Sequence, residues 1–184
     1  MRIITGSARG MKLRTLSGLD VRPTTDQVKE SVFSIIQFEI EGARVLDLFA
    51  GSGQLGIEAL SRGASKAVFV DSNREAVKVV KENLEHTKLA DRAAVRNEDS
   101  LQFLKVTKDV FDIAFVDPPY ANELMGKVLE DLPAKMSENG IIICETSKEE
   151  TLRDSAGRFR KLKEYKYGKT KLTVFRPAEE SEDD

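Results

Sequence analysis

Two motifs combine residue types that could carry chemistry. The first is the glycine turn Gly51-Ser52-Gly53-Gln54-Leu55-Gly56, and Asp71 stands 20 residues beyond Gly51. Glycines let a backbone approach a ligand, a helix N-terminus favours an anion, and a carboxylate at a strand end can accept hydrogen bonds from ribose hydroxyls. The motif therefore indicates a cofactor that contains a nucleoside. The alternative is a tight strand-to-helix turn without a ligand.

Asp47 decides between cofactors, because it lies inside the apolar run before the glycine turn. A carboxylate there would oppose the diphosphate of a dinucleotide, but it suits the ammonium group and the cationic sulfur of S-adenosylmethionine. We therefore expect Asp47, Gly51, Gly53 and Asp71 to bind S-adenosylmethionine, although Asp47 has the alternative role of stabilising the turn. Asp99 is expected to accept from the cofactor's adenine amino group, or to cap the next helix, or both.

The second motif is Asp117-Pro118-Pro119-Tyr120, which ends the apolar run 111–116. Two successive prolines remove two N–H donors and fix the chain, so a carboxylate and a rigid carbonyl can accept both N–H bonds of an –NH₂ group. The ring of Tyr120 offers a stacking face for a planar base. Holding the N–H bonds out of the base plane aims the nitrogen lone pair at a methyl donor. The motif predicts methyl transfer to a base amino group; the alternative is a turn without catalysis.

The elements around these motifs alternate between apolar strands and helices from residue 43 onward. Strands are expected at 45–49, 67–70, 93–95, 111–116 and 140–145, with an antiparallel hairpin formed by 162–167 and 171–175. This pattern predicts an α/β fold with a doubly wound, mostly parallel sheet, whose ligands bind at the carboxyl ends of the strands. Residues 1–22 are expected to be β-rich, and a helix follows with Thr24 or Thr25 as its N-cap.

The net charge of −2 hides a segregation of signs. Both ends of the folded part are basic, and they would form a phosphate-binding surface; the alternative is an ordinary solvated surface. The bases expected to bind RNA are Arg2, Arg9, Lys12, Arg14 and Arg22. We expect three segments: an N-terminal RNA-contacting extension (1–42), a methyltransferase domain (43–177) and a disordered acidic tail (178–184).

The composition also bears on disulfides, metal sites and the expected cellular location. With Cys144 as the single cysteine, no internal disulfide is possible, and no metal site is expected. No apolar run is long enough to cross a bilayer, and the first residues do not resemble a secretion signal. We expect a cytoplasmic protein without a membrane partner, which is a monomer or a weak dimer.

Four segments, in this order, resemble the RsmD family of bacterial 16S ribosomal RNA guanine-N2 methyltransferases. The resemblance covers residues 1 to about 176, and its most specific elements are the two N-terminal ones. It implies a Rossmann-like class I methyltransferase fold, S-adenosylmethionine as cofactor and one guanine of the assembled or assembling small subunit as target. By resemblance, Asp47, Gly51, Gly53, Asp71 and Asp99 hold the cofactor and Asp117 to Tyr120 hold the amino group. The segments are Gly6-Ser7-Ala8-Arg9-Gly10, Arg22-Pro23-Thr24-Thr25-Asp26, Asp47-Leu48-Phe49-Ala50-Gly51-Ser52-Gly53 and Asp117-Pro118-Pro119-Tyr120.

Three other functions stay open. A DNA adenine-N6 methyltransferase also carries the second motif, but such enzymes usually need a target-recognition domain, and only about 40 N-terminal residues are spare here. An NAD-dependent oxidoreductase would use the glycine turn and Asp71, but it leaves Asp117 to Tyr120 unexplained. A non-catalytic RNA-binding module could retain the same fold.

Overall fold

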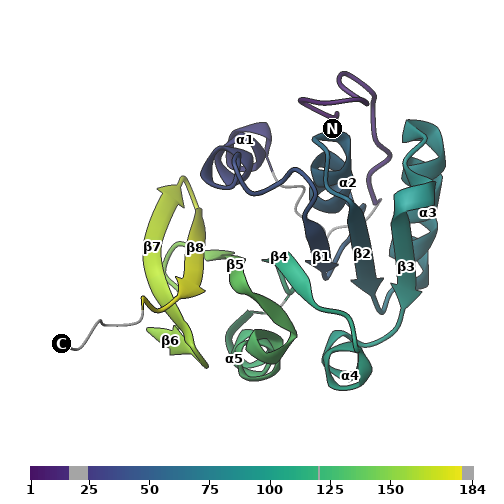
Figure 1. Ribbon diagram of the computed structural model, residues 1–184. Helices are drawn as coiled ribbons and strands as arrows, with labels where there is room; N and C mark the ends of the chain where they lie inside the picture. The colour runs from purple at the N-terminus through teal and green to yellow at the C-terminus, as the bar shows by residue number, and fades with distance from the viewer. Residues whose placement is uncertain (17–24, 120, 180–184) are drawn as a thin grey trace.

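The computed structural model describes residues 1–16, 25–119 and 121–179. Its strands form one eight-stranded sheet in the order β3-β2-β1-β4-β5-β8-β7-β6 (Figure 1). β1 to β5 are mutually parallel. β8 pairs with β5, β7 with β8 and β6 with β7, and each of these three pairs is antiparallel. This confirms the α/β fold with its C-terminal hairpin. The strands are β1 (Arg44–Leu48), β2 (Lys66–Asp71), β3 (Ala93–Asn97), β4 (Phe111–Val116), β5 (Met136–Ser147), β6 (Ser155–Ala156), β7 (Phe159–Tyr167) and β8 (Thr170–Pro177).

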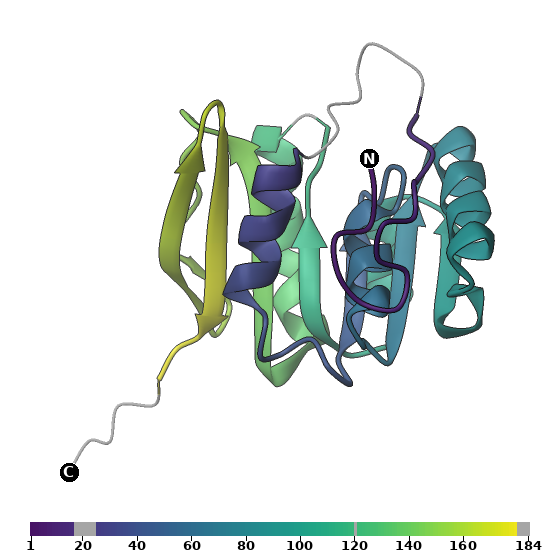
Figure 2. The ribbon, with the colours of Figure 1, turned by 90° about the horizontal axis from the view of Figure 1, so that it is seen from above.

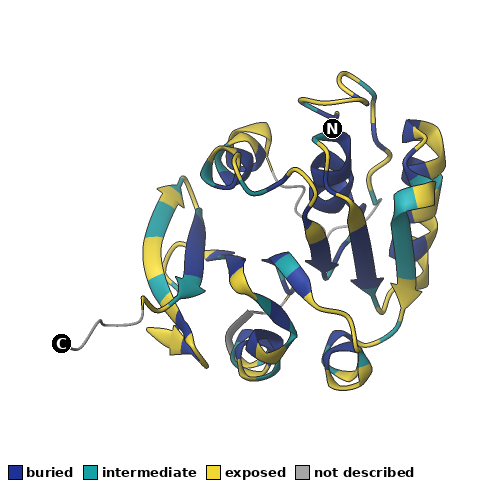
Figure 3. Cartoon of the chain, viewed as in Figure 1, coloured by how far each residue is buried: buried dark blue, intermediate teal, exposed yellow. Residues whose placement is uncertain are grey.

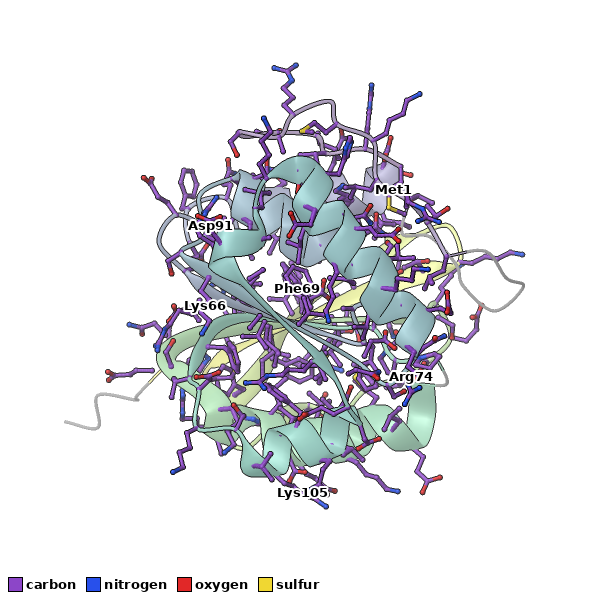
Figure 4. All side chains as sticks on the ribbon, turned by 90° about the vertical axis from the view of Figure 1, so that its right-hand side faces the viewer. Met1, Lys66, Phe69, Arg74, Asp91 and Lys105 are labelled. Atoms are coloured by element: carbon purple, nitrogen blue, oxygen red, sulfur yellow. The ribbon has the colours of Figure 1, made fainter. Side chains whose placement is uncertain are left out.

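Helices cover both faces of the sheet. Figure 1 shows α1, α2 and α3 on one face and α4 and α5 on the other. Figure 4, seen along the sheet, shows Phe69 of β2 in the middle of the molecule, with Lys66 and Arg74 towards opposite edges. The helices are α1 (Asp26–Ile35), α2 (Gln54–Ser61), α3 (Arg74–Thr87), α4 (Ser100–Val106) and α5 (Ala121–Asp131), with the short 3-10 helices η1 (Ala90–Arg92) and η2 (Leu132–Lys135).

The alternation of side chains along each strand divides the core into two layers. Phe115 points towards α1, where its ring centroid lies 5.9 Å from that of Phe33. Val116, the next residue, packs into the second cluster with Leu129 of α5. Figure 3 shows the result: in α1, α3, α4 and α5 the surfaces that face the sheet are buried and the outward surfaces are exposed, whereas α2 is buried throughout. Within the described residues, no helix is long and apolar enough to cross a membrane.

The N-terminal segment differs from the prediction. Residues 1–16 are not β-rich: they contain one isolated bridge, between Arg2 and Lys12. The reason is that the backbone N–H groups of Ile4 and Thr5 donate to the carboxylate of Glu58 on α2, so they are not available for a strand ladder. The expected helix does follow, and Thr25 is its N-cap, since its side chain accepts a hydrogen bond from the N–H of Val28.

The strand boundaries also differ, most clearly in three places. β5 begins at Met136 and β7 begins at Phe159, both earlier than expected, and the two-residue strand β6 was not predicted. The early part of β5 contains Ser137 and Asn139, residue types that usually mark a turn. These additions lie at the sheet's antiparallel side or far from the strand ends expected to bind ligands, so the predicted ligand edge is unchanged.

Candidate active site

The glycine turn joins β1 to α2 through a tight backbone path. Phe49 has φ 64°, which is rare for a residue with a side chain, and Gly51 and Gly53 have φ 58° and 80°. Glycine adopts these angles without strain, so both turn glycines suit their positions. A carboxylate oxygen of Asp71 accepts a hydrogen bond from the Gly51 N–H at 2.9 Å. The end of β2 therefore holds the glycine turn in place.

Gly56 has a packing role. A Cβ atom there would lie 2.3 Å from the Cε1 atom of Phe69, which is far inside the contact distance. Only glycine lets α2 lie this close to β2. The Gly56 N–H, in the first turn of α2, donates to a carboxylate oxygen of Asp47 at 3.0 Å. Asp47 thus stabilises the turn, which is one of the two roles considered for it, and its contact with a cofactor stays a prediction.

The environment of Asp47 disfavours its negative charge. Burial raises the pKa of Asp47 to about 7; the Gly56 N–H acts against the rise, and the charge of Asp71 adds to it. The side chain is 4% exposed. A buried carboxylate of this kind gains stability when a cation binds beside it. The site is therefore electrostatically suited to a positively charged ligand.

The residues expected to bind the adenine and ribose of the cofactor follow β2 and β3. Asp71 accepts from the N–H groups of both Gly51 and Asn73, while Asn97 donates to the carbonyl oxygens of Asp71 and Ser72. Asp99 caps α4, because its side chain accepts a hydrogen bond from the Gln102 N–H at 2.9 Å. Its N-cap role is confirmed, and its role towards adenine stays a prediction.

Asp117 ends β4 beside the neighbouring strand β5. Val116 is in register with Cys144, so Asp117 and Glu145 are the next residues of two parallel strands. Burial raises the pKa of Asp117 well above its usual value, and the negative charges of Glu145 and Asp47 raise it further. Asp117 stays partly accessible, Pro118 is buried and Pro119 is exposed. Tyr120 lies outside the described residues.

Together these residues form an acidic edge of the sheet, which we define as Asp47, Asp71, Asp117 and Glu145. They come from four strands, β1, β2, β4 and β5, or from the residues directly after them. The buried Oε1 of Gln54, the first residue of α2 and three positions after Gly51, has no hydrogen-bond partner among the described residues. Burial and neighbouring negative charges disfavour the ionised forms of Asp47 and Asp117, so a positively charged ligand at this edge would stabilise them. This arrangement is typical of a binding site and not of a structural turn alone.

The basic residues expected to bind RNA do not all lie in one part of the structure. Arg2, Arg9, Lys12 and Arg14 are all exposed, and Arg14 also pairs with Glu82 of α3. The N-terminal segment runs along α2 and back (Figure 2). Its two ends lie near the glycine turn, and its tip lies at the other end of α2, where the Ser7 N–H donates to the Ser61 carbonyl. Arg9 is at this tip, so the structure does not bring it to the acidic edge. Arg22 lies outside the described residues.

Buried polar side chains hold this segment on the helices. The Lys29 ammonium and Glu58 carboxylate are 3.2 Å apart and fully buried, and Lys29 also donates to the Arg2 carbonyl. Burial lowers the pKa of Lys29, and Glu58 acts against the change. On α3, Asn83 exchanges two hydrogen bonds with the backbone of Arg14 and donates a third to the Ser52 carbonyl in the glycine turn. The N-terminal segment is therefore tied directly to the glycine turn.

With this geometry, comparison with known proteins identifies the family. The family model described as "Conserved hypothetical protein 95" matches residues 1–176. The Haemophilus influenzae protein named ribosomal RNA small subunit methyltransferase D is 39% identical over 83% of this chain and 81% of its own length. The chain belongs to the family that this model describes. The YlbH protein of Bacillus subtilis is 38% identical over 96% of this chain and 98% of its own length.

Solved structures of the family agree with the fold. The yhhF protein of Escherichia coli superposes with a TM-score of 0.87 at 33% identity, covering 98% of this chain and 99% of its own. The strand order found here, with β8 inserted antiparallel beside β5, is that of a Rossmann-like class I methyltransferase. The recognition from the four sequence segments is thus confirmed.

Several functional candidates in this family member were missed from the sequence. Glu145 follows the apolar run 140–144, and the rule that ligands bind at strand ends would have selected it. Glu58, Lys29 and Asn83 carried no such signal, because charged and amide residues on a helix usually indicate a solvated face.

Proposed function

We propose that this protein transfers the methyl group of S-adenosylmethionine to the exocyclic N2 amino group of a guanine in small-subunit ribosomal RNA. The observation that carries the proposal is the acidic edge, where burial and mutual repulsion raise the pKa values of Asp47 and Asp117. A cationic cofactor would relieve this repulsion, whereas the diphosphate of NAD would add to it.

The residues beside the acidic edge fit S-adenosylmethionine. Asp47 would face the positive end of the cofactor, and Asp71 would accept from the ribose hydroxyls, since each carboxylate oxygen has capacity for more than one hydrogen bond. The unpartnered Oε1 of Gln54 supplies a further acceptor. Gly51 keeps the backbone free of a side chain beside the ligand, where a Cβ would meet no protein atom within 4 Å, and Gly53 lets the turn pack closely, since a Cβ there would lie 3.2 Å from Val80. Asp99 would accept from the adenine amino group.

The residues after β4 fit the substrate amino group. Asp117 and the Pro118 carbonyl would accept its two N–H bonds, and Tyr120 would stack on the base. This directs the nitrogen lone pair towards the methyl group. S-adenosylmethionine, when bound, supplies a methyl group on a cationic sulfur that becomes a neutral thioether as the nitrogen–carbon bond forms. Asp117, with its raised pKa, is suited to accept the proton that the nitrogen then loses.

Ribosomal RNA as substrate rests on the relatives and on charge. The relative from Haemophilus influenzae is named for methylation of the small subunit. In this chain, Arg2, Lys12 and Arg14 are exposed near the glycine turn, where phosphates beside the target would lie. A target base must leave its stack to reach Asp117, which favours a loop or another unpaired nucleotide.

The test uses small ribosomal subunits from cells that lack this protein. We expect incubation with the protein and S-adenosylmethionine to place one methyl group per subunit, recovered after nuclease digestion as N2-methylguanosine. Recovery of N6-methyladenosine would favour an adenine methyltransferase instead. No transfer, with intact RNA binding, would favour the non-catalytic module.

A further inference from the structure

The surface of β7 that faces the α1 side of the sheet carries two tyrosines. Tyr165 and Tyr167 are half-buried and pack against the core cluster that includes Leu172 and Val174 of β8. The Nζ atom of Lys163 lies 4.9 Å from the centroid of the Tyr165 ring. Because residues two apart on a strand point the same way, Lys163, Tyr165 and Tyr167 line one face. Each tyrosine is partly exposed to solvent.

The register of the sheet places Tyr165 level with Asp117, and Tyr167 lies two residues further along β7. Tyr165 pairs with Leu172, Leu172 pairs with Glu145, and Glu145 is the β5 neighbour of Asp117. Paired residues point to the same face, so this row crosses the sheet on one side. Three strand spacings separate its ends by roughly 14 Å. Figure 2 shows the β7–β8 turn at the same edge as the connection from β4 to α5.

The lysines of the hairpin fall into two groups. Lys161 and Lys171 pair with Glu164 and lie mostly inside the protein. Lys163, Lys166 and Lys169 are exposed, and within the part of the chain that the structure describes none of the three pairs with a carboxylate. Lys163 lies on the face of the two aromatic rings and Lys169 lies in the turn beyond them, whereas Lys166, between the two tyrosines on the strand, points to the opposite face. The hairpin thus presents two uncompensated positive charges beside the aromatic rings.

We propose that Tyr165 and Tyr167 form a stacking platform for an unpaired RNA base near the target nucleotide, and that Lys163 and Lys169 contact the adjoining phosphates. The inference rests on the proposed function, and it assigns to the C-terminal hairpin the recognition of RNA beside the methylated base. Aromatic rings surrounded by basic side chains recognise single-stranded RNA through stacking and phosphate contacts. Protein interfaces, by contrast, are poor in lysine.

The test compares four tyrosine variants. Tyr165→Leu and Tyr167→Leu remove the ring, whereas Tyr165→Phe and Tyr167→Phe keep it and remove only the hydroxyl. Phe38→Leu is the matched control, because Phe38 is 91% exposed and is followed by Glu39, which pairs with Arg176 at the opposite edge of the sheet. Melting temperature and S-adenosylhomocysteine affinity establish that each variant is folded and binds cofactor.

Two readouts are measured with S-adenosylhomocysteine or S-adenosylmethionine bound. One is the affinity for a single-stranded RNA oligonucleotide that carries 2-aminopurine beside its guanine, with fluorescence quenching reporting stacking. The other is single-turnover methylation of undermethylated small subunits over a range of concentrations. Each leucine variant should weaken binding by about 5- to 150-fold and reduce the quenching, while the phenylalanine variants and Phe38→Leu stay within about 2-fold. Lys163→Gln should lower the salt dependence by about one phosphate contact.

The outcomes separate the platform from the proposed function. Methylation by the wild-type protein together with unchanged binding in both leucine variants would overturn the platform alone. Equal losses in the leucine and phenylalanine variants would overturn it too, because they would assign the effect to the hydroxyl. A loss with whole subunits but not with the oligonucleotide would assign the surface to a ribosomal protein and overturn it. Failure of the wild-type protein to bind RNA or methylate subunits would overturn both.

Discussion

The carboxylate of Asp47 lies inside the protein and accepts a hydrogen bond from the Gly56 N–H at 3.0 Å. Its pKa of about 7 makes cofactor binding depend on pH. A cationic ligand favours the ionised form, so affinity for S-adenosylmethionine should rise as the pH increases through about 7, with release of a proton. Calorimetry in two buffers of different ionisation enthalpy measures this release. Asp47→Asn should bind S-adenosylmethionine more weakly than wild type, and its affinity should change less with pH. Identical pH profiles of affinity for wild type and Asp47→Asn would contradict the role of Asp47.

The same group has the opposite effect on stability without ligand. The folded protein binds this proton more tightly than the unfolded chain, in which the pKa of Asp is near 3.8. The contribution of Asp47 to stability is therefore fully present below that value and is lost as the pH rises through about 7. Melting temperatures of wild type and Asp47→Asn should diverge in favour of the variant as the pH rises through this window.

Asp71 should affect cofactor affinity more than the fold. Asp71→Ala removes the acceptor for the Gly51 N–H and the proposed acceptor for the ribose hydroxyls, so affinity for S-adenosylhomocysteine should fall by about 10- to 150-fold. Titration calorimetry gives this value. The exposed Asp91, on η1, provides the control substitution Asp91→Ala, which should leave the affinity unchanged. A normal dissociation constant for folded Asp71→Ala would refute the assignment.

Substitution by alanine should have opposite effects on the stability of the protein at Gly56 and at Gly126. Gly56→Ala would force Cβ against Phe69, so it should destabilise the protein by about 1–3 kcal/mol. Gly126 lies in α5 with no close neighbour except a flexible arginine nitrogen at 3.4 Å, so Gly126→Ala should stabilise by about 0.5–1 kcal/mol. Urea unfolding measures both. The Gly56→Ala cost should shrink in a Phe69→Leu background, and equal effects at the two glycines would argue against the close packing of α2 on β2.

Asn83 should couple the N-terminal segment to the glycine turn. Asn83→Ala leaves the Arg14 N–H and the Ser52 carbonyl without their partner, at a cost of about 1–3 kcal/mol. Hydrogen exchange of the Arg14 amide should accelerate, and RNA affinity should fall because the basic residues 1–14 lose their fixed position. His86→Ala, at an exposed position of α3, is the control. Unchanged exchange at Arg14 would show that the segment is held by other contacts.

The sequence predicted those parts of the structure that repeat a simple pattern. The parallel strands β1, β2 and β4 were recognisable because each is a short apolar run that ends at a carboxylate or a glycine turn. Asp47, Asp71 and Asp117 were selected for that reason, and the structure brings them to one edge. The proximity of Glu145 to Asp117 required the β4–β5 register, which neighbouring residues in the chain do not encode.

The N-terminal segment shows what local patterns miss. Its residues were expected to pair as strands, but the N–H groups of Ile4 and Thr5 bind Glu58, a residue more than fifty positions away in the chain. Lys29 and Glu58 have the composition of a solvated helix surface, and only the packing of three segments makes them a buried pair. Long-range satisfaction of buried polar groups outweighed local strand propensity.

The most direct test of the account is the single-turnover rate of methyl transfer to undermethylated small subunits by wild type and Asp117→Ala. Removing one of two acceptors for the amino group should slow transfer by about 10²–10³-fold, while S-adenosylhomocysteine affinity and melting temperature change little. Asp112→Ala, on the same strand but beside Arg44 at the other edge, should transfer at the wild-type rate. Near-normal transfer by Asp117→Ala would contradict the account, since the turn after β4 would then be structural.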